Sequence, residues 1–440
     1  MKFVSSRADS AGRQKPVSFR QAVFSGLSPD GGLYVPLEQP DLSGRIAGVS
    51  KQTSFLELAV TIVGELVGEE LGREAARRVC ERAFTFEPDL QPLEDGLTLL
   101  ELFNGPTCAF KDFGASFLAS SMEEFLRQES HRAVILVATS GDTGSAVARA
   151  FHGKRNIQVV ILYPSGRVSA LQEQQLTTVG GNVTALEIKG SFDDCQRLVK
   201  QAFVDSELRR ILALSSANSI NLGRLLPQAL YYIYGHLQLE RGGNQPLLFC
   251  VPSGNFGNLT AGVYAWQWGL PVQGFIAATN VNDVVPEYLL TGEFRPRSSL
   301  KTLSNAMDVG DPSNFERLQV VFGGSVDKMR EWIKGIRITD PETRRTMLQV
   351  YRDSGILIDP HTAVGVLAAR RYREEVRFSG QILSLATAHP GKFVDIVREA
   401  TGVTPDLPAT LKEALSKEKE AVPLEPSLDL LKDFLLDHYG

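Results

Sequence analysis

The segment at residues 104–114, NGPTCAFKDFG, places a single lysine among phenylalanines. Phe110 and Phe113 lie on either side of Lys111, and Phe117 follows about one helical turn later. Aromatic neighbours draw a segment toward a core, where a partly desolvated lysine amine has a lowered pKa and attacks carbonyl carbons. The alternative is a surface lysine whose amine reaches back into solvent. Other polar segments of the chain are needed to distinguish a buried, reactive lysine from a surface lysine.

Two glycine-bearing segments could hold anions. The segment 139–151, TSGDTGSAVARAF, leads from hydroxyl and glycine residues into a helical pattern, and a helix N-terminus offers unpaired N–H groups to a carboxylate or phosphate. The segment 252–262, PSGNFGNLTAG, matches neither nucleotide-binding glycine motif, but Gly254 and Gly257 would let backbone N–H groups wrap a phosphate. Taken singly, the first could be a plain helix cap and the second a turn.

Two further polar segments complete the set. The segment 215–224, SSANSINLGR, ends in Arg224 and offers hydroxyl, amide and guanidinium donors to an anion. In the segment 387–393, TAHPGKF, Thr387 directly follows an apolar run, whereas His389 is expected to be structural because no second histidine or cysteine accompanies it. Together, the four segments and the lysine suggest pyridoxal phosphate, whose aldehyde captures an amine and whose phosphate occupies a glycine loop.

The elements that must position these residues alternate along the chain. Five short runs are apolar throughout, as expected of strands in a sheet that is covered on both faces. They are AVILVA (133–138), VVILY (159–163), LLFCV (247–251), FIAAT (275–279) and ILSLA (382–386). Helical patterns separate them, which predicts βαβ units and an α/β fold with a mostly parallel sheet. Ligands in such folds bind beyond the carboxyl ends of the strands.

Composition divides the chain into three zones. Residues 1–95 look helical and connective, with helical apolar spacing in FLELAVTIVGELVGEELG. Residues 96–400 contain the alternating strands and helices. Residues 401–440 contain four prolines, the charged run KEKE and the amphipathic stretch LDLLKDFLLDHY, which together predict a helical tail.

Composition also excludes several classes of protein. The 440 residues are 43% hydrophobic and 22% charged, a globular balance rather than a disordered one. The formal net charge is −5 without a basic block, so no nucleic-acid or membrane partner is expected. The four cysteines form no CxxC pair, which argues against a disulfide framework and a metal site. Without an apolar signal core or spanning segment, the expected location is the cytoplasm.

The ordered motifs resemble the threonine synthase family of fold type II pyridoxal phosphate enzymes. They are SFRQAVFSGLSPDGGLYVP (18–36), ELFNGPTCAFKDFG, ATSGDTGSAVA, SANSINLGRLLPQ, VPSGNFGNLTAG, ATNVNDVVP, TLSNAMDVGDPSN and ATAHPGKF, and they span nearly the whole chain. LSNAMDVGDPSN and TAHPGKF are typical of the longer branch of many bacteria and fungi. The resemblance implies two open, mostly parallel α/β lobes like those of tryptophan synthase β, with the cofactor between them and a mainly helical N-terminal region.

The resemblance also implies roles for individual residues. Lys111 would bind the cofactor covalently, and Thr387 would hydrogen-bond to its pyridine nitrogen. The cofactor's phosphate would be held by the backbone N–H groups of Gly254, Asn255, Phe256, Gly257 and Asn258. The substrate's phosphate would be held by Asn218, Ser219 and Arg224. The substrate's α-carboxylate would be held by Thr139, Ser140 and Thr143.

Asp142 departs from the shorter branch of the resembled family, which commonly has asparagine beside the cofactor's ring hydroxyl. A carboxylate that faces a phenolate needs one shared proton, so a cofactor contact of Asp142 is left open. Cys108, three residues before Lys111, is expected to pack silently.

The implied reaction converts O-phospho-L-homoserine and water into L-threonine and phosphate, the last step of threonine biosynthesis. Lys111, once displaced by the substrate amine, would remove the Cα proton. One alternative is a related phospholyase or dehydratase that releases 2-oxobutyrate. Another is a catalytically silent homologue that binds a ligand, although Lys111, Thr387 and an intact GNFGN loop speak against it. The expected assembly is a monomer or homodimer.

Overall fold

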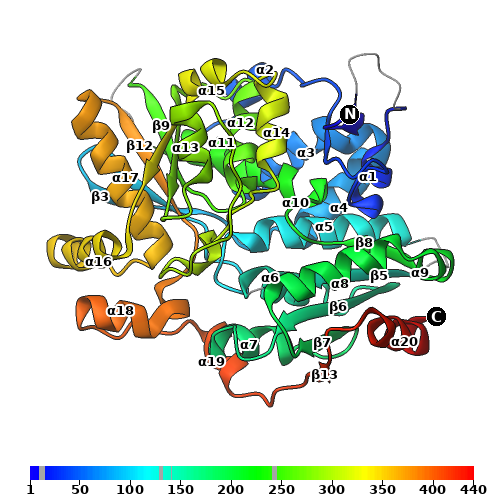
Figure 1. Cartoon of the computed structure of the whole chain (residues 1–440). Coiled ribbons are helices and arrows are strands. Elements are labelled where there is room, and N and C mark those ends of the chain that lie inside the picture. Colours follow the sequence, from blue (N-terminus) through cyan, green and yellow to red (C-terminus); the bar gives the residue numbers. More distant parts are fainter. Residues whose placement is uncertain (9–14, 128–131, 140, 240–244) are drawn as a thin grey trace.

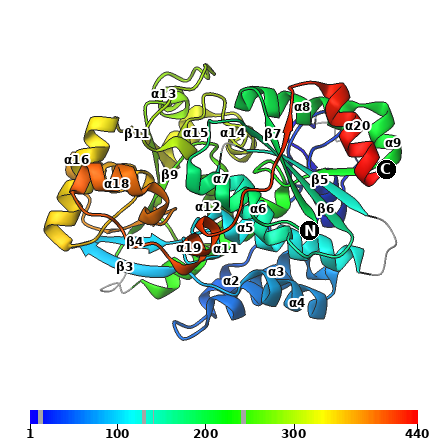
Figure 2. The same ribbon diagram turned by 90° about the horizontal axis from the view of Figure 1, so that it is seen from below.

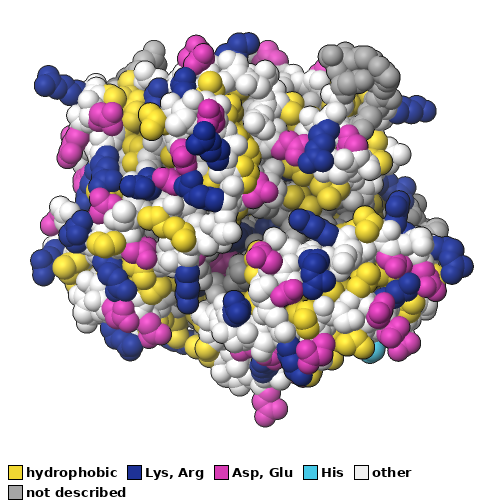
Figure 3. Space-filling view, viewed as in Figure 1, with side chains coloured by type: hydrophobic (Ala, Val, Ile, Leu, Met, Phe, Trp, Pro, Cys, Tyr) yellow, Lys and Arg dark blue, Asp and Glu magenta, His cyan; other side chains and the backbone are white. Residues whose placement is uncertain are grey.

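The computed structural model describes residues 1–8, 15–127, 132–139, 141–239 and 245–440. Its strands form two large sheets and one two-stranded ribbon, and helices cover the sheets (Figure 1). Basic and acidic side chains are intermixed over the face seen in Figure 3, without a large patch of one sign.

The first region of the chain packs four helices and the ribbon against the rest. These are α1 (Phe19–Ser25), α2 (Ser43–Ala47), α3 (Phe55–Leu71), α4 (Arg73–Ala83), β1 (Phe3–Ser5) and β2 (Tyr34–Pro36). Helix α3 confirms the helical prediction. Its N-terminus is a capping box in which Ser54 Oγ accepts the N–H of Glu57 and the Glu57 carboxylate accepts the N–H of Ser54.

The larger sheet has six strands in the order β11-β10-β9-β12-β4-β3. They are β3 (Asp89–Glu94), β4 (Leu97–Glu101), β9 (Leu247–Pro252), β10 (Gly274–Thr279), β11 (Ile333–Arg337) and β12 (Gln381–Ala386). All neighbours are parallel except the antiparallel edge pair β3 and β4. The expectation that residues 1–95 are helical and connective is therefore wrong for β1, β2 and β3. The polar sequence of β3 suits a partly exposed edge.

The second sheet has five strands, all parallel, in the order β13-β7-β6-β5-β8. They are β5 (Ala133–Ala138), β6 (Ile157–Pro164), β7 (Val183–Ile188), β8 (Ala213–Ser216) and β13 (Val422–Leu424). All five strands predicted from apolar runs are confirmed, as β5, β6, β9, β10 and β12. The α/β fold with two mostly parallel lobes is thus present.

Helices flank both sheets, and α5 (Lys111–Leu126) packs on α4, α6 and α10. The helices around the five-stranded sheet are α6 (Asp142–Phe151), α7 (Ala170–Thr177), α8 (Phe192–Val204) and α9 (Ser206–Ile211). The other helices are α10 (Leu222–Leu225), α11 (Ala229–Gln238), α12 (Gly257–Gln267), α13 (Val284–Thr291), α14 (Phe315–Val321), α15 (Val326–Trp332), α16 (Asp340–Ser354) and α17 (Pro360–Val376). Short 3₁₀ turns are η1 (Leu226–Gln228), η2 (Asn305–Met307) and η3 (Pro390–Phe393).

The C-terminal segment runs along both lobes (Figure 2). Its elements are α18 (Val394–Thr401), α19 (Ala409–Leu415), β13 and α20 (Leu428–Tyr439). Helix α18 packs on α16, α19 packs on α7, β13 pairs with β7, and α20 packs on α8. The expected helical tail therefore also contains a strand. Among the described residues, no helix combines the length and apolar character needed to cross a membrane.

Candidate active site

The predicted site segments follow five strands at their carboxyl ends. Lys111 comes after β4, Thr387 after β12 and residues 254–258 after β9, all in the six-stranded sheet. Residues 139–143 and 218–224 come after β5 and β8, which are neighbours in the five-stranded sheet. Because parallel strands end at the same edge, each sheet brings its own segments together. Side-chain contacts then join the two groups.

Lys111 is the first residue of α5, and 14% of its side chain is exposed. Its Nζ lies 3.5 Å from Asp142 Oδ2 and 5.1 Å from the centre of the Phe110 ring. Burial lowers the pKa of the Lys111 amine, and the nearby carboxylate of Asp142 opposes this effect. The amine is thus poorly hydrated, as the sequence predicts.

The other two phenylalanines of this segment pack away from the amine. Phe113 meets the rings of Phe86 and Tyr231 at centroid distances of 4.8 and 5.4 Å. Phe117 stacks on Phe84. These rings anchor α5 in the aromatic core and so fix the position of its first residue.

The turn before the lysine is held by Asp112. Its carboxylate accepts the backbone N–H of Thr107 at 2.8 Å and the Thr107 hydroxyl at 2.6 Å. Burial raises the pKa of Asp112 to about 6. A Cβ at Gly105 would lie 2.5 Å from Asp112 Oδ2, so the turn requires glycine there. Cys108 is buried with its thiol 3.5 Å from the Thr410 hydroxyl, in agreement with a packing role.

Asp142 lies between two lysines. Its Oδ1 is 2.9 Å from Lys392 Nζ and accepts a hydrogen bond from Gln172 Nε2 at 3.0 Å, while Oδ2 faces Lys111. Lys392 is fully buried, and its Nζ also donates to the Thr107 carbonyl at 2.9 Å. Burial alone would raise the pKa of Asp142, but the two ammonium groups hold it well below its usual range. Asp142 is therefore a carboxylate.

Lys392 is a site residue that sequence reasoning missed. It lies between Gly391 and Phe393 at the end of TAHPGKF, directly after a buried strand. Lys111 was recognised by the same signal, a lysine with apolar neighbours. In this segment, His389 was considered for a chemical role and Lys392 was not.

The loop after β9 has the form of an anion cradle. Phe256 adopts a left-handed conformation with φ of 60°, immediately before Gly257 begins α12. Such a turn points successive N–H groups into one concavity, which the positive end of the helix dipole reinforces. A Cβ at Gly254 would lie 2.6 Å from Met307 Cα, so no side chain fits there.

Asn258 and Asn255 fix this loop from both sides. Asn258 Oδ1 accepts the hydroxyls of Tyr231 and Tyr232 at 2.6 and 2.7 Å. Its buried Nδ2 has no partner among the described residues. Asn255 Nδ2 donates to Ser219 Oγ at 2.7 Å, which joins the glycine loop to the loop after β8. Contact between the two lobes is therefore made at the candidate site itself.

Arg224 is a buried cation. Its side chain is 2% exposed, Nη1 donates to the Ala217 carbonyl at 2.6 Å, and burial lowers its pKa to about 10. Within the described part of the chain, its Nε has no hydrogen-bond partner and its guanidinium forms no ion pair with a carboxylate. Asn218 Oδ1 is likewise buried without a partner among those residues. A Cβ at Gly114 would lie 3.1 Å from Arg224 Nε, so the guanidinium lies against α5.

The loop after β5 is shaped by Thr139. The Thr139 hydroxyl accepts the N–H groups of Gly141 and Gly144 at 3.0 and 2.9 Å, and it donates to the Gly141 carbonyl. This buried hydroxyl supports the loop, and a substrate contact of Thr139 or of the partly exposed Thr143 stays a prediction. Ser140 lies outside the described residues.

Thr387 lies beside the lysine-bearing turn. Phe110 donates its N–H to the Thr387 carbonyl at 2.9 Å, and the threonine is buried. His389 caps the following 3₁₀ turn, because its Nδ1 accepts the Gly391 N–H at 3.0 Å, and its ring meets Phe103 edge to face. Burial lowers the pKa of His389. These contacts agree with the structural role expected for the histidine.

These features fit pyridoxal phosphate. A buried donor without an acceptor is unfavourable by about 1–3 kcal/mol, so Asn258 Nδ2 and Arg224 Nε both favour a ligand with acceptor atoms, and the charge of Arg224 favours an anion. The glycine loop and the Arg224 loop are separate candidate anion sites, and the hydrogen bond from Asn255 to Ser219 joins them. The buried amine of Lys111 completes the set with a nucleophile for an aldehyde.

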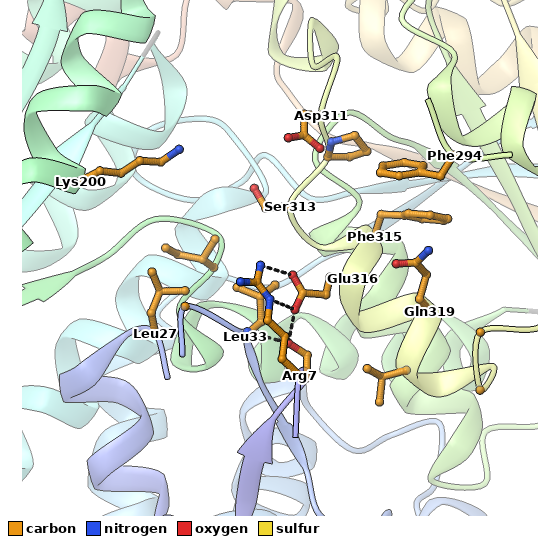
Figure 4. Close-up of a pocket in the computed structure, with 17 residues that line it drawn as sticks. Arg7, Leu27, Leu33, Lys200, Phe294, Asp311, Ser313, Phe315, Glu316 and Gln319 are labelled. Atoms are coloured by element: carbon orange, nitrogen blue, oxygen red, sulfur yellow. Dashed lines mark hydrogen bonds and ion pairs between the residues drawn. The ribbon is translucent and has the colours of Figure 1, made fainter. Parts of the chain in front are cut away.

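A pocket of about 760 Å³ opens beside these loops (Figure 4). Its lining includes Ile220 and Ser313, and the Ser313 N–H donates to Asn255 Oδ1 at 2.6 Å. Arg7 binds the carboxylate of Glu316 with two nitrogens at 3.0 and 3.1 Å on another part of the wall. The lysine that begins α5 does not line this pocket, which therefore borders the candidate site rather than enclosing it.

Three family models match the chain. One described as "Pyridoxal-phosphate dependent enzyme" matches residues 92–388, one described as "Threonine synthase N terminus" matches residues 2–84, and one described as "Threonine synthase, C-terminal" matches residues 362–435.

Similar proteins match over nearly their full length. A threonine synthase from Serratia marcescens is 41% identical over 420 residues, which cover 96% of each chain. A structure of pyridoxal-phosphate-bound threonine synthase from Brucella melitensis has a TM-score of 0.92 and 38% identity, covering 100% of this chain and 99% of that one. The threonine synthase of Escherichia coli has a TM-score of 0.90 and 41% identity, covering 100% of both chains.

Proposed function

Because the chain belongs to the threonine synthase family of pyridoxal-phosphate-dependent enzymes, we propose that it converts O-phospho-L-homoserine and water into L-threonine and phosphate. The observation that carries the proposal is the buried amine of Lys111, which lies near a glycine loop and a loop with the buried Arg224. Both the cofactor and the substrate carry a phosphate. The glycine loop would bind the phosphate of the cofactor, and the Arg224 loop would bind that of the substrate.

The cofactor would be held by loops of the six-stranded sheet. Lys111 would bind it covalently, and the backbone N–H groups of residues 254–258 would hold its phosphate. Thr387 would hydrogen-bond to the pyridine nitrogen, and a neutral hydroxyl there does not force that nitrogen to stay protonated. When bound, pyridoxal phosphate withdraws electrons from the Cα atom of a joined amino acid, which acidifies its Cα proton.

Lys111 is the proposed acid and base. Once displaced by the substrate amine, its Nζ can take the Cα proton, which requires a neutral amine. The burial that lowers its pKa favours that form. Asp142, 3.5 Å away, can stabilise the ammonium group that results. A contact of Asp142 with the cofactor's ring hydroxyl is part of the same proposal.

The substrate would be held by its two anionic ends. Its phosphate would lie at Asn218, Ser219 and Arg224, since the planar guanidinium can bind two oxygens at once. Its α-carboxylate would lie at the start of α6, with Thr139, Ser140 and Thr143. Holding both ends fixes the Cα and Cβ atoms relative to the lysine amine.

The products test the proposal. The purified protein is loaded with pyridoxal phosphate and given O-phospho-L-homoserine, and threonine, 2-oxobutyrate and phosphate are measured. Threonine and phosphate in equal amounts support the proposal, whereas 2-oxobutyrate in place of threonine would identify a phospholyase or dehydratase. The loaded protein should have a visible absorption band that disappears in Lys111→Ala. If it has no such band, the protein is a homologue that only binds ligands.

We also propose three functional regions: an N-terminal region at residues 1–95, a cofactor-binding core at 96–400 and a C-terminal tail at 401–440. Limited proteolysis would test these boundaries. The proposed location is the cytoplasm, and the proposed assembly is a monomer or homodimer, which light scattering on the purified protein would distinguish.

A further inference from the structure

Lys392 is a fully buried lysine that the proposed reaction does not use. Its Nζ lies 2.9 Å from both Asp142 Oδ1 and the Thr107 carbonyl. We propose that Lys392 is a positioning residue whose ammonium group neutralises Asp142 and so frees the Lys111 amine for chemistry. The inference rests on the proposed role of Lys111 as the cofactor-binding lysine.

The two carboxylate oxygens of Asp142 have different partners. Oδ1 takes Lys392 at 2.9 Å and Gln172 at 3.0 Å, whereas Oδ2 faces Lys111 at the longer distance of 3.5 Å. A distance of 2.9 Å is that of a charge-assisted hydrogen bond, and 3.5 Å is at the limit of one. The tighter ion pair is therefore with Lys392, and Lys111 is held only loosely.

A buried carboxylate needs a compensating charge, because removing one partner of a buried ion pair is strongly destabilising. If Lys392 carried no charge, Lys111 would be the remaining cation beside Asp142 and would be held as an ammonium group. With Lys392 present, Asp142 stays neutralised whether Lys111 is protonated, neutral or bonded to a ligand. Lys111 can then change its charge without leaving an unpaired carboxylate behind.

The other titratable groups described near Asp142 do not neutralise its carboxylate in place of Lys392. Among the described residues, the ion-pair partners of Asp142 are Lys111 and Lys392. Arg224 lowers the pKa of Lys111, as Lys392 does, but it makes no ion pair with Asp142. The carboxylate of Asp112 accepts the Thr107 N–H in the turn before Lys111. Burial raises the pKa of the Cys108 thiol, which favours its uncharged form.

The same argument concerns cofactor capture. The neutral Lys111 amine would supply the lone pair that forms a C–N bond to the aldehyde carbon, and both amine protons would leave with the aldehyde oxygen as water. An ammonium group has no lone pair and must first lose its proton to solvent. A protein in which Asp142 holds Lys111 protonated should therefore capture the aldehyde slowly.

The test follows the visible spectrum of the loaded protein against pH, which reports protonation of the nitrogen that joins Lys111 to the cofactor. In Lys392→Met, which keeps a chain of similar length without the charge, Asp142 is no longer neutralised and favours the protonated form. We expect the apparent pKa of that nitrogen to rise by about one unit or more, a tenfold shift in the equilibrium. Capture of pyridoxal phosphate by the cofactor-free protein at neutral pH should slow about tenfold.

Two further variants keep the test decisive if Lys392→Met does not fold. Asp142→Asn combined with Lys392→Met removes both charges and should bring the apparent pKa back toward the wild-type value. Asp142→Asn alone should lower the apparent pKa, because Lys392 then acts unopposed. A pKa that stays at the wild-type value in Asp142→Asn, or in a folded Lys392→Met, would overturn the inference.

Two controls separate this inference from the proposed function. Lys154 forms an ion pair with Glu123 at 3.0 Å outside the site, so Lys154→Met is a matched substitution that should leave the apparent pKa unchanged. Lys111→Ala should abolish the absorption band altogether. If the band survives Lys111→Ala, the assignment of the cofactor lysine is wrong; if only the Lys392 and Asp142 shifts are absent, the inference alone fails.

Discussion

Arg224 and Arg317 are both buried guanidinium groups, but their hydrogen bonds differ. Arg317 donates to the carbonyls of Tyr34 and Ile220 and to Asn314 Oδ1, so all three of its nitrogens are used. Arg224 donates from Nη1, while its Nε has no partner among the residues that the structure describes. Arg317 thus has the contacts of a structural residue, whereas Arg224 keeps a buried donor that an anion could accept.

The first prediction concerns Arg224→Ala. Removing one partner of a buried, hydrogen-bonded charge pair costs about 2 kcal/mol or more, so kcat/KM for O-phospho-L-homoserine should fall by about 30-fold or more. Cofactor affinity should change little, because the glycine loop is the proposed site of the cofactor's phosphate. Steady-state kinetics and a cofactor titration by fluorescence give the two values. Equal losses in both would mean that Arg224 serves the cofactor's phosphate.

The second prediction concerns Asp112 and pH. Its pKa of about 6 in the folded protein lies above the ordinary value near 3.9, so the folded state binds the proton more tightly between these pH values. The contribution of Asp112 to stability is therefore present below about pH 4 and is lost as the pH rises through 6.

Chemical unfolding of the cofactor-free protein measures this effect by comparison with Asp112→Asn, which does not titrate. The stability of the wild type relative to the variant should fall by about 2–3 kcal/mol between pH 4 and pH 7. A difference that does not change over this range would show that the Asp112 carboxyl keeps its ordinary pKa in the folded protein.

Residue types revealed part of this site in advance. Lys111 could be recognised because its phenylalanine neighbours imply burial, although only the structure shows that Phe110 faces the amine and Phe113 does not. The ion pair of Lys392 with Asp142 could not be predicted from residue types, since 250 residues of sequence separate its two members. A charge pair across two lobes is a property of the fold rather than of any local pattern.

At the scale of elements, the connection from β9 to α12 shows how backbone shape serves the site. Gly254 lies against the backbone of η2, at Met307, and the left-handed Phe256 turns the chain into α12. Asn258, in the first turn of that helix, is fixed by two tyrosines of α11. The cradle is thus clamped by helices on one side and by a 3₁₀ turn on the other.

The third prediction is that Gly254→Ala weakens cofactor binding. Its Cβ would meet backbone atoms at 2.6 and 2.9 Å, which cannot move aside as a flexible side chain can, and overpacking of this kind costs about 1–3 kcal/mol. The cofactor dissociation constant should rise by about tenfold. Gly64→Ala in α3 is the matched control, because its Cβ would meet nothing within 4 Å. That variant should bind the cofactor normally.

Two of the strands that the sequence patterns missed, β7 and β8, are not apolar throughout. Strand β7, VTALEI, exposes Thr184 and Glu187 in part, so it lacks the uniform apolar character of the five predicted strands. Strand β8 is only four residues long and ends in the buried serines Ser215 and Ser216. Ser215 can be buried because its hydroxyl donates to the carbonyl of Val23 in α1. The partner that satisfies this hydroxyl is nearly two hundred residues away, so its burial could not be predicted from the local sequence.

At the scale of the whole molecule, the C-terminal segment joins parts that are otherwise far apart in the sequence. Leu411 of α19 packs in one small cluster with Cys108, three residues before Lys111, and with Leu171 of α7. Beyond it, Leu431 and Leu435 of α20 complete the core between α8 and the five-stranded sheet. The segment therefore stabilises the lysine-bearing turn and the second lobe together.

The fourth prediction compares two neighbouring leucines of α20. Leu431 is fully buried, so Leu431→Ala should destabilise the protein by about 2–5 kcal/mol through lost burial and a cavity. Leu430 is 43% exposed, and Leu430→Ala should change stability by about 0.5 kcal/mol at most. Urea unfolding of both variants gives the comparison. Similar effects at the two positions would show that α20 does not pack on the second lobe in solution.

The place of β13 at the edge of the five-stranded sheet has a consequence for protein synthesis. Residues 422–424 pair with β7, which the ribosome completes long before it reaches them. Until they emerge, β7 presents an unpaired edge, and unpaired edges promote association with other chains. Translation products that end before β13 should therefore aggregate more readily than chains that include it.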